Sequence, residues 1–90
     1  MQVEQTVVLT NPHGLHARPA TIFVAACNSF ACDVVVIKEG IEVNGKSVMG
    51  IMMLGAEKGS TLLIRTSGED AGPAARELAR LVESGFGEGG

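Results

Sequence analysis

Tryptophan and tyrosine are absent from this chain of 90 residues, which has three phenylalanines and no cluster of basic residues. The net charge is −3. This composition argues against a nucleic-acid partner, because proteins that bind nucleic acids use basic and aromatic side chains for contact. A chain of this length forms one domain and has little room for a deep catalytic cleft. We therefore expect a small acidic protein whose partners are other proteins.

Cysteine is also scarce, and the spacing of Cys27 and Cys32 matches no recognised metal or redox motif, so we expect two free thiols. His13 and His16 could coordinate one metal ion together, but zinc needs three or four protein ligands and the sequence shows no third ligand. We expect no metal and no cofactor. The longest apolar runs, such as residues 34–37, are too short to cross a membrane. The first residues also lack the basic segment followed by an apolar segment that is typical of a signal peptide. These absences predict a cytoplasmic protein without membrane insertion.

Hydrophobic periodicity predicts elements in the order β-α-β-β-α-β-α. Strands are expected at residues 3–10, 33–38, 41–43 and 60–66, and helices at 16–28, at 47–54 and from 69–72 onward. Each helix has one apolar stripe to bury, which favours an α+β fold: a four-stranded antiparallel sheet with three helices on one face. The domain is expected to span residues 1–90, with a frayed tail at 87–90.

Alternation along the strands divides their apolar side chains between two faces of the sheet. The face toward the helices is expected to carry Val7, Leu9, Val34, Val36, Leu62 and Ile64. The opposite face then carries four apolar residues, which are Val8, Val35, Ile37 and Leu63. A monomer is the expected state, and a homodimer through this outer face is the alternative.

The strongest chemical signal lies in residues 14–19, where a histidine stands at the point at which a turn-rich loop becomes a helix. The first N–H groups of a helix lack partners within it and, with the helix dipole, attract an anion. Arg18 can bind two oxygens of the same phosphate. The helix field disfavours a protonated ring, so we expect His16 to be a neutral nucleophile near pH 7. The pattern predicts a phosphoryl acceptor at His16, with the backbone of Ala17 and Arg18 contacting the phosphate.

Two segments resemble HPr, the family of histidine-containing phosphocarriers of the bacterial sugar phosphotransferase system. Residues 14–20 look like the family's phosphorylation-site motif, and residues 46–55 resemble its regulatory-serine segment. The spacing between the two also agrees, and the similarity runs from about residue 3 to residue 86. The resemblance implies the open-faced β-sandwich of that family, which agrees with the fold predicted from periodicity.

The resemblance also implies roles for individual residues. His16 would accept phosphate on Nδ1 from phosphoenolpyruvate by way of a first enzyme, and would donate it to sugar-specific second enzymes. Arg18 matches the family's phosphate-contacting arginine. Ser47 matches the serine that an ATP-dependent kinase/phosphorylase modifies in many of these bacteria.

The short helix after Ser47 offers a candidate docking surface. Serine is a favoured helix N-cap, so Ser47 is expected to cap this helix whether or not it is phosphorylated. A phosphate there would add about two negative charges to the docking surface and block docking without unfolding the protein. The residues expected to be exposed are Val48, Met49 and Met52, while Ala17, Ala20, Val24 and Cys27 could extend the surface along the first helix. Ile51 and Leu54 are expected in the core.

Three functions fit the sequence. The first is the sugar-system phosphocarrier, which depends on partner enzymes because the chain shows no nucleotide loop and no second acid or base beside His16. The second is a regulatory paralogue in a nitrogen-related phosphorelay. The third is an interaction module that binds an anion without covalent change. The sequence leaves open the roles of His13, Glu83 and Glu88, which sugars are served, and whether Ser47 is modified.

Overall fold

The computed structural model describes residues 1–87. Its strands are β1 (Gln2–Val8), β2 (Asp33–Lys38), β3 (Ile41–Asn44) and β4 (Thr61–Ser67), and its helices are α1 (Ala17–Asn28), α2 (Val48–Met53) and α3 (Ala71–Glu83). A short 3-10 turn, Gly85–Gly87, follows α3 and was not predicted. The predicted order and the α+β class are confirmed, with shifts of one or two residues at the ends of elements.

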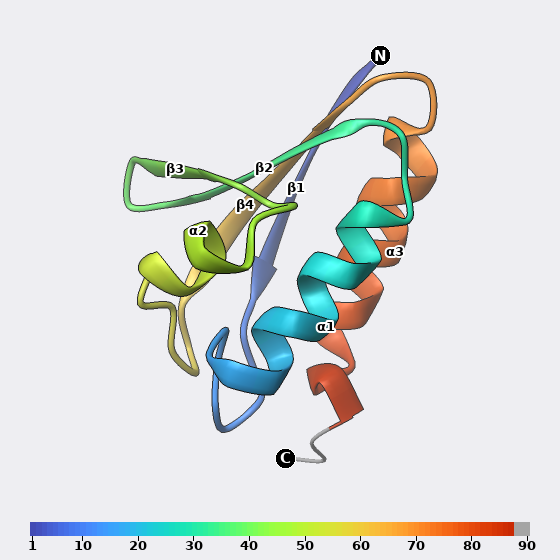
Figure 1. Cartoon of the computed structure of the whole chain (residues 1–90). Coiled ribbons are helices and arrows are strands. Elements are labelled where there is room, and N and C mark those ends of the chain that lie inside the picture. Colours follow the sequence, from blue (N-terminus) through green and yellow to red (C-terminus); the bar gives the residue numbers. More distant parts are fainter. Residues whose placement is uncertain (88–90) are drawn as a thin grey trace.

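The four strands form one antiparallel sheet in the order β1-β4-β2-β3. Val7 pairs with Leu62 across β1 and β4, and Ile64 pairs with Val36 across β4 and β2. Figure 1 shows α1 and α3 side by side along the sheet, with α2 near the β2–β3 hairpin. No helix within residues 1–87 has the length and apolar character needed to span a membrane.

The inner face of the sheet forms one side of the hydrophobic core, as predicted. All six inner residues expected from alternation are buried, namely Val7, Leu9, Val34, Val36, Leu62 and Ile64. On the outer face Val8 is exposed, while Val35, Ile37 and Leu63 are half-buried. The Arg65 guanidinium crosses this face, with Nε 3.0 Å from Glu4 and Nη1 3.9 Å from Glu42. The outer face is therefore a mixture of aliphatic and ionic side chains, where the sequence suggested an apolar patch.

The buried side of α1 is wider than predicted. The three- and four-residue spacing of Pro19, Ile22, Phe23 and Ala26 in the sequence predicts that these four face the core. In the structure Ile22 and Ala26 are only half-buried, whereas Ala20, Val24 and Cys27 are buried. At the C-terminal end of α1 the connection after β3 packs against the helix. A Cβ placed on Gly45 would lie 3.3 Å from the Cys27 sulfur, and the Asn28 amide donates to the Lys46 carbonyl at 3.2 Å.

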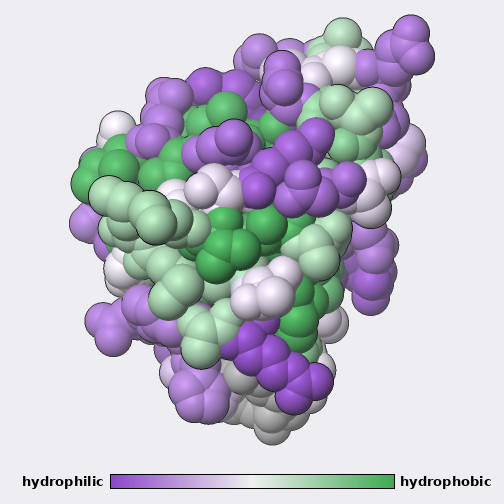
Figure 2. All heavy atoms as spheres, viewed as in Figure 1, coloured by the Kyte–Doolittle hydropathy of each residue, from purple (hydrophilic) through white to green (hydrophobic). Residues whose placement is uncertain are grey.

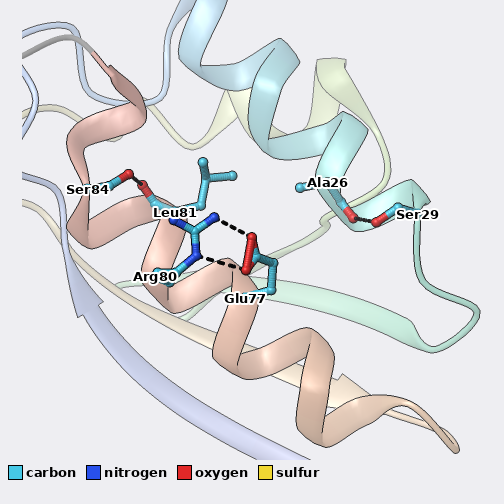
Figure 3. Close-up of polar contacts among 6 residues, drawn as sticks. All are labelled: Ala26, Ser29, Glu77, Arg80, Leu81 and Ser84. Atoms are coloured by element: carbon cyan, nitrogen blue, oxygen red, sulfur yellow. Dashed lines mark hydrogen bonds and ion pairs between the residues drawn. The ribbon is translucent and has the colours of Figure 1, made fainter.

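Serine hydroxyls close the ends of the two long helices (Figure 3). Ser29 donates to the Ala26 carbonyl at 2.6 Å after α1, and Ser84 donates to the Leu81 carbonyl at 2.7 Å after α3. The same view shows the guanidinium of Arg80 on the Glu77 carboxylate along α3, an exposed pair spaced i,i+3. The two serine hydroxyls thus add hydrogen bonds to carbonyls in the last turns of these helices, where partners within the helix run out. The predicted tail at 87–90 begins with Gly87 inside the 3-10 turn, and its other three residues lie outside the described part of the chain.

Candidate active site

His16 stands at the N-cap of α1, with extended backbone angles of −115° and 155°. Its side chain is half-buried and makes no capping hydrogen bond to the first turn. The N–H groups of that turn are therefore not occupied by the N-cap side chain. Pro19 is buried within the first turn, where its missing N–H costs nothing.

The residue after His16 has an unusual backbone. Ala17 has a φ of +48°, in the left-handed region that a residue with a Cβ seldom adopts. Next to it Arg18 is exposed, and none of the ion pairs within residues 1–87 involves its guanidinium. An arginine without an acidic partner beside a helix N-terminus can bind an incoming phosphate with both arms of its fork. Sequence reasoning found the pair His16 and Arg18 but not the strained alanine between them.

The loop that presents His16 is held rigidly. The Asn11 side-chain amide donates to the Gly14 carbonyl at 2.9 Å, and the Gly14 N–H donates back to the Asn11 carbonyl at 3.2 Å. Leu15 is buried, and its N–H donates to the Ala56 carbonyl at 2.9 Å. Gly14 has a φ of +59°, and a Cβ there would lie 2.4 Å from that same carbonyl oxygen. The loop therefore rests on the segment that follows α2, which brings the short helix close to His16.

Ser47 caps α2 as predicted. Its Oγ accepts a hydrogen bond from the Gly50 N–H at 3.1 Å, and its own N–H donates to the Asn44 carbonyl at 3.1 Å. The Lys46 ammonium is drawn away from the hydroxyl, because it donates to the Phe30 carbonyl beyond the end of α1 at 2.8 Å. The serine is half-buried, so its hydroxyl is partly open to solvent.

The exposed face of α2 forms a shallow apolar pocket of about 490 Å³, which we call the methionine patch. It is lined by Val48, Met49, Met52 and Met53. In Figure 2 the green spheres of apolar residues gather on the left of the molecule, over α2, with purple hydrophilic residues around them. Ile51 and Leu54 are buried beneath, as expected. Met53 was missed by sequence reasoning, although its i,i+4 spacing from Met49 places the two on one side of the helix.

Part of the predicted docking surface is wrong. Ala20, Val24 and Cys27 were expected to extend it along α1, but all three are buried, and the chain that joins β3 to α2 passes close to the Cys27 sulfur at Gly45. Ala17 is exposed at the start of the helix, so it is the one member of that group that a partner could reach. The available surface therefore consists of the entrance to α1 and the methionine patch.

Neither cysteine contributes to the site. Burial raises the pKa of the Cys27 thiol to about 12, with nearby Lys46 opposing the effect in part. Burial also raises the pKa of Cys32, whose thiol lies beside the Asp70 carboxylate. Both thiols are therefore protonated and unreactive at neutral pH. Among residues 1–87 no group of three or more histidine, cysteine or acidic side chains is arranged to hold a metal ion.

Comparison with known proteins gives one consistent result. Residues 3–84 match the family model described as the PTS HPr component phosphorylation site. Phosphocarrier protein HPr of Neisseria meningitidis serogroup A is 41% identical over 97% of this chain and 98% of its own. HPr-like protein Crh of Bacillus subtilis is also 41% identical, over 90% of this chain and 95% of its own. A crystal structure of HPr from Thermoanaerobacter tengcongensis superposes with a TM-score of 0.93 and 42% identity, covering 96% of this chain and 97% of that one.

These matches cover both the loop of His16 and the segment of Ser47, within a fold that agrees over nearly the whole chain. The HPr proteins of Neisseria meningitidis and Xylella fastidiosa are matched over 98% and 97% of their own lengths. The chain belongs to the HPr family of phosphocarrier proteins of the bacterial phosphotransferase system.

Proposed function

We propose that His16 accepts a phosphoryl group from a first enzyme charged by phosphoenolpyruvate and passes it to sugar-specific second enzymes. The lone pair of an imidazole nitrogen forms a bond to phosphorus while the bond from phosphorus to the donor atom of the first enzyme breaks. The second transfer reverses the roles, and the histidine becomes the leaving group. The observation that carries this proposal is the half-buried His16, whose side chain leaves the start of α1 uncapped, together with the exposed Arg18, which forms no ion pair within residues 1–87.

The rest of the first turn would stabilise the phosphorylated state. The N–H groups of Ala17 and Arg18 are the donors nearest to the imidazole along the chain, and the Arg18 guanidinium adds a fixed positive charge. The chain supplies the acceptor histidine and the N–H and guanidinium groups that bind the phosphate. The donor and recipient enzymes supply the remaining catalytic groups. We therefore regard it as a phosphoryl-transfer intermediate that turns over only with its partners.

Docking of both enzymes is proposed on the methionine patch and the exposed entrance to α1. Methionine side chains are flexible and polarisable, so one patch can fit several different partner surfaces. Ser47 borders the patch at the N-cap of α2 and is partly accessible. We propose that an ATP-dependent kinase modifies it, and that the added charge weakens docking.

A regulatory paralogue is the second candidate, because the HPr-like protein Crh matches as well as several HPr proteins do. The intact glycine, histidine and arginine at positions 14, 16 and 18 favour both of these candidates over a module that only binds an anion, since such a module has no need of an acceptor nitrogen on a helix N-terminus. The two candidates differ in what they do with the phosphate.

The test is to incubate the protein with phosphoenolpyruvate and the first enzyme of a bacterial sugar phosphotransferase system, then map acid-labile phosphate by peptide mass spectrometry. We expect one phosphate on His16, none on the His16→Gln variant, and normal labelling of the His13→Gln control. Transfer from the labelled protein to a sugar-specific second enzyme supports the carrier. Labelling without transfer to any second enzyme supports the paralogue, and no labelling at all leaves only non-covalent anion binding.

A further inference from the structure

Three of the four methionines of this chain lie on α2, on the exposed side of the helix. Met49 is 74% exposed, Met53 77% and Met52 42%. With Val48 they form the whole lining of the 490 Å³ pocket, so no polar side chain of the described residues shields them there. The accessible sulfur of this protein is thus concentrated on the proposed docking surface.

The cysteine thiols are far less accessible than the methionine thioethers. Cys27 and Cys32 are buried, so an oxidant in solution reaches the thioethers of α2 before it reaches a thiol. When a hydroperoxide meets an exposed thioether, a lone pair of the sulfur attacks a peroxide oxygen. The S–O bond forms as the O–O bond breaks, and water or an alcohol leaves. The sulfur is oxidised by two electrons and the peroxide is reduced, giving methionine sulfoxide.

We propose that the methionine patch is an oxidation-sensitive site, at which hydroperoxides convert Met49 and Met53 to sulfoxides and thereby weaken docking of the partner enzymes. This inference rests on the proposed function. Docking on an apolar patch releases water, whereas a sulfoxide oxygen that is buried without a donor loses its hydrogen bonds to water. We expect the loss of affinity to be at least about tenfold. Sulfoxide reductases restore the thioether, so the change is reversible.

The experiment compares three proteins before and after hydrogen peroxide. They are the wild type, a Met49→Leu/Met52→Leu/Met53→Leu variant that cannot be oxidised on α2, and a Met1→Leu variant. Met1 is the matched control because it is 78% exposed but lies near Gly72 at the start of α3, at a distance from the patch. Oxidised positions are mapped by peptide mass spectrometry, and affinity for the first enzyme is measured by calorimetry.

Each protein is compared only with its own untreated form. We expect wild type and Met1→Leu to lose affinity at least tenfold and to recover it after treatment with both sulfoxide reductases. The triple leucine variant should keep its affinity unchanged by peroxide. Wild type that carries sulfoxide at positions 49 and 53 yet binds as before overturns the proposal, as does a loss of affinity in the triple variant.

The failure of the proposed function looks different. Untreated protein that binds the first enzyme but acquires no phosphate on His16 contradicts the carrier function and leaves the effect of peroxide on binding measurable. Untreated protein that does not bind the first enzyme at all overturns both proposals.

Discussion

The backbone N–H of Leu15 donates to the carbonyl of Ala56 at 2.9 Å and joins the loop before His16 to the chain that leaves α2. The two residues lie far apart in sequence, and each belongs to one half of the candidate site. The bond fixes the acceptor histidine relative to the surface on which its partners are proposed to dock. A disturbance of this contact should therefore affect phosphoryl transfer as well as stability.

Gly14→Ala tests that contact. The new Cβ would stand 2.4 Å from the Ala56 carbonyl oxygen at a φ of +59°. Gly55 is a matched control, because its φ is +61° and nothing lies within 4 Å of its Cβ position. Gly55→Ala should cost about 1–2 kcal/mol from backbone strain, and the overlap at Gly14 should add roughly 1–3 kcal/mol. Urea denaturation measures both, and equal losses in the two variants would show that the loop does not press on Ala56.

Ser47 allows the cap to be separated from the charge. Ser47→Ala removes the acceptor for the Gly50 N–H and should lower the free energy of unfolding by about 1 kcal/mol. Ser47→Asp keeps an acceptor at the N-cap, so its melting temperature should barely fall, while its phosphorylation at His16 slows because a negative charge stands beside the methionine patch. Calorimetric melting and the rate of His16 labelling check the pair. A Ser47→Asp protein that unfolds readily but is labelled at the normal rate would contradict the proposal.

Asp70 gives stability a dependence on acid pH. Its carboxylate accepts hydrogen bonds from the backbone N–H groups of Ala31 and Cys32, at 2.8 and 2.9 Å, and these hold the pKa of Asp70 below its usual value of 3.8. A lowered folded-state pKa contributes stability that is present above the unfolded value and is lost as the pH falls through the folded one. Asp70→Asn should therefore melt lower than wild type at pH 7, and the gap should narrow below pH 3.8. Asp33→Asn is the control, and melting curves from pH 7 to pH 2 that stay parallel for wild type and Asp70→Asn would contradict the assignment.

Cys27 acts at the opposite end of the pH scale. Burial raises the pKa of its thiol from 9.0 to about 12, so the folded protein holds a proton that the unfolded chain releases near pH 9. A raised folded-state pKa contributes stability that is complete below the unfolded value and declines as the pH rises above it. We expect the free energy of unfolding to fall between pH 9 and pH 11, and to fall less steeply in Cys27→Ala. Urea denaturation across this range is the measurement, and identical slopes would remove the thiol as the cause.

Arg65 keeps the outer face of the sheet from being purely aliphatic. Its guanidinium reaches Glu4 and Glu42 and lies among half-buried aliphatic residues of that face. Arg65→Leu should expose a continuous apolar surface, and we expect that variant to self-associate at concentrations where wild type is monomeric. Arg76→Leu, which removes an exposed cation from α3, should stay monomeric. Sedimentation velocity distinguishes these outcomes, and dimers in wild type and in both variants would support the homodimer alternative.

The parts of the fold that depend on local pattern could be predicted from the sequence. Alternation in residues 33–38 put Val34 and Val36 in the core, and the serine before an apolar run marked the start of α2. Such signals lie within a few residues of the element that they define. For the same reason the order of elements followed from the sequence, while their ends shifted by a residue or two.

What could not be predicted depends on contacts between distant segments. Asp70 was expected to begin a helix, and it stands at the N-cap, but its side chain instead binds residues 31 and 32. Cys27 was placed on the surface because nothing in its own helix shows that the chain around Gly45 covers it. The left-handed backbone of Ala17 likewise has no local signal, since alanine has no preference for that conformation.

The position of the turn after α3 decides which end of this protein is better suited to a fused tag. Gly85 lies against the loop of His16, where a Cβ on it would be 3.8 Å from the Cβ of Asn11, and Phe86 is buried. The opposite end of the chain is far from this loop in Figure 1, and the Met1 carbonyl accepts from the Gly68 N–H at 2.8 Å. A purification tag, fluorophore or tether joined before Met1 therefore starts at the end of the molecule away from the phosphate entrance, whereas Gly85, near the last of the described residues, lies against the loop that carries His16.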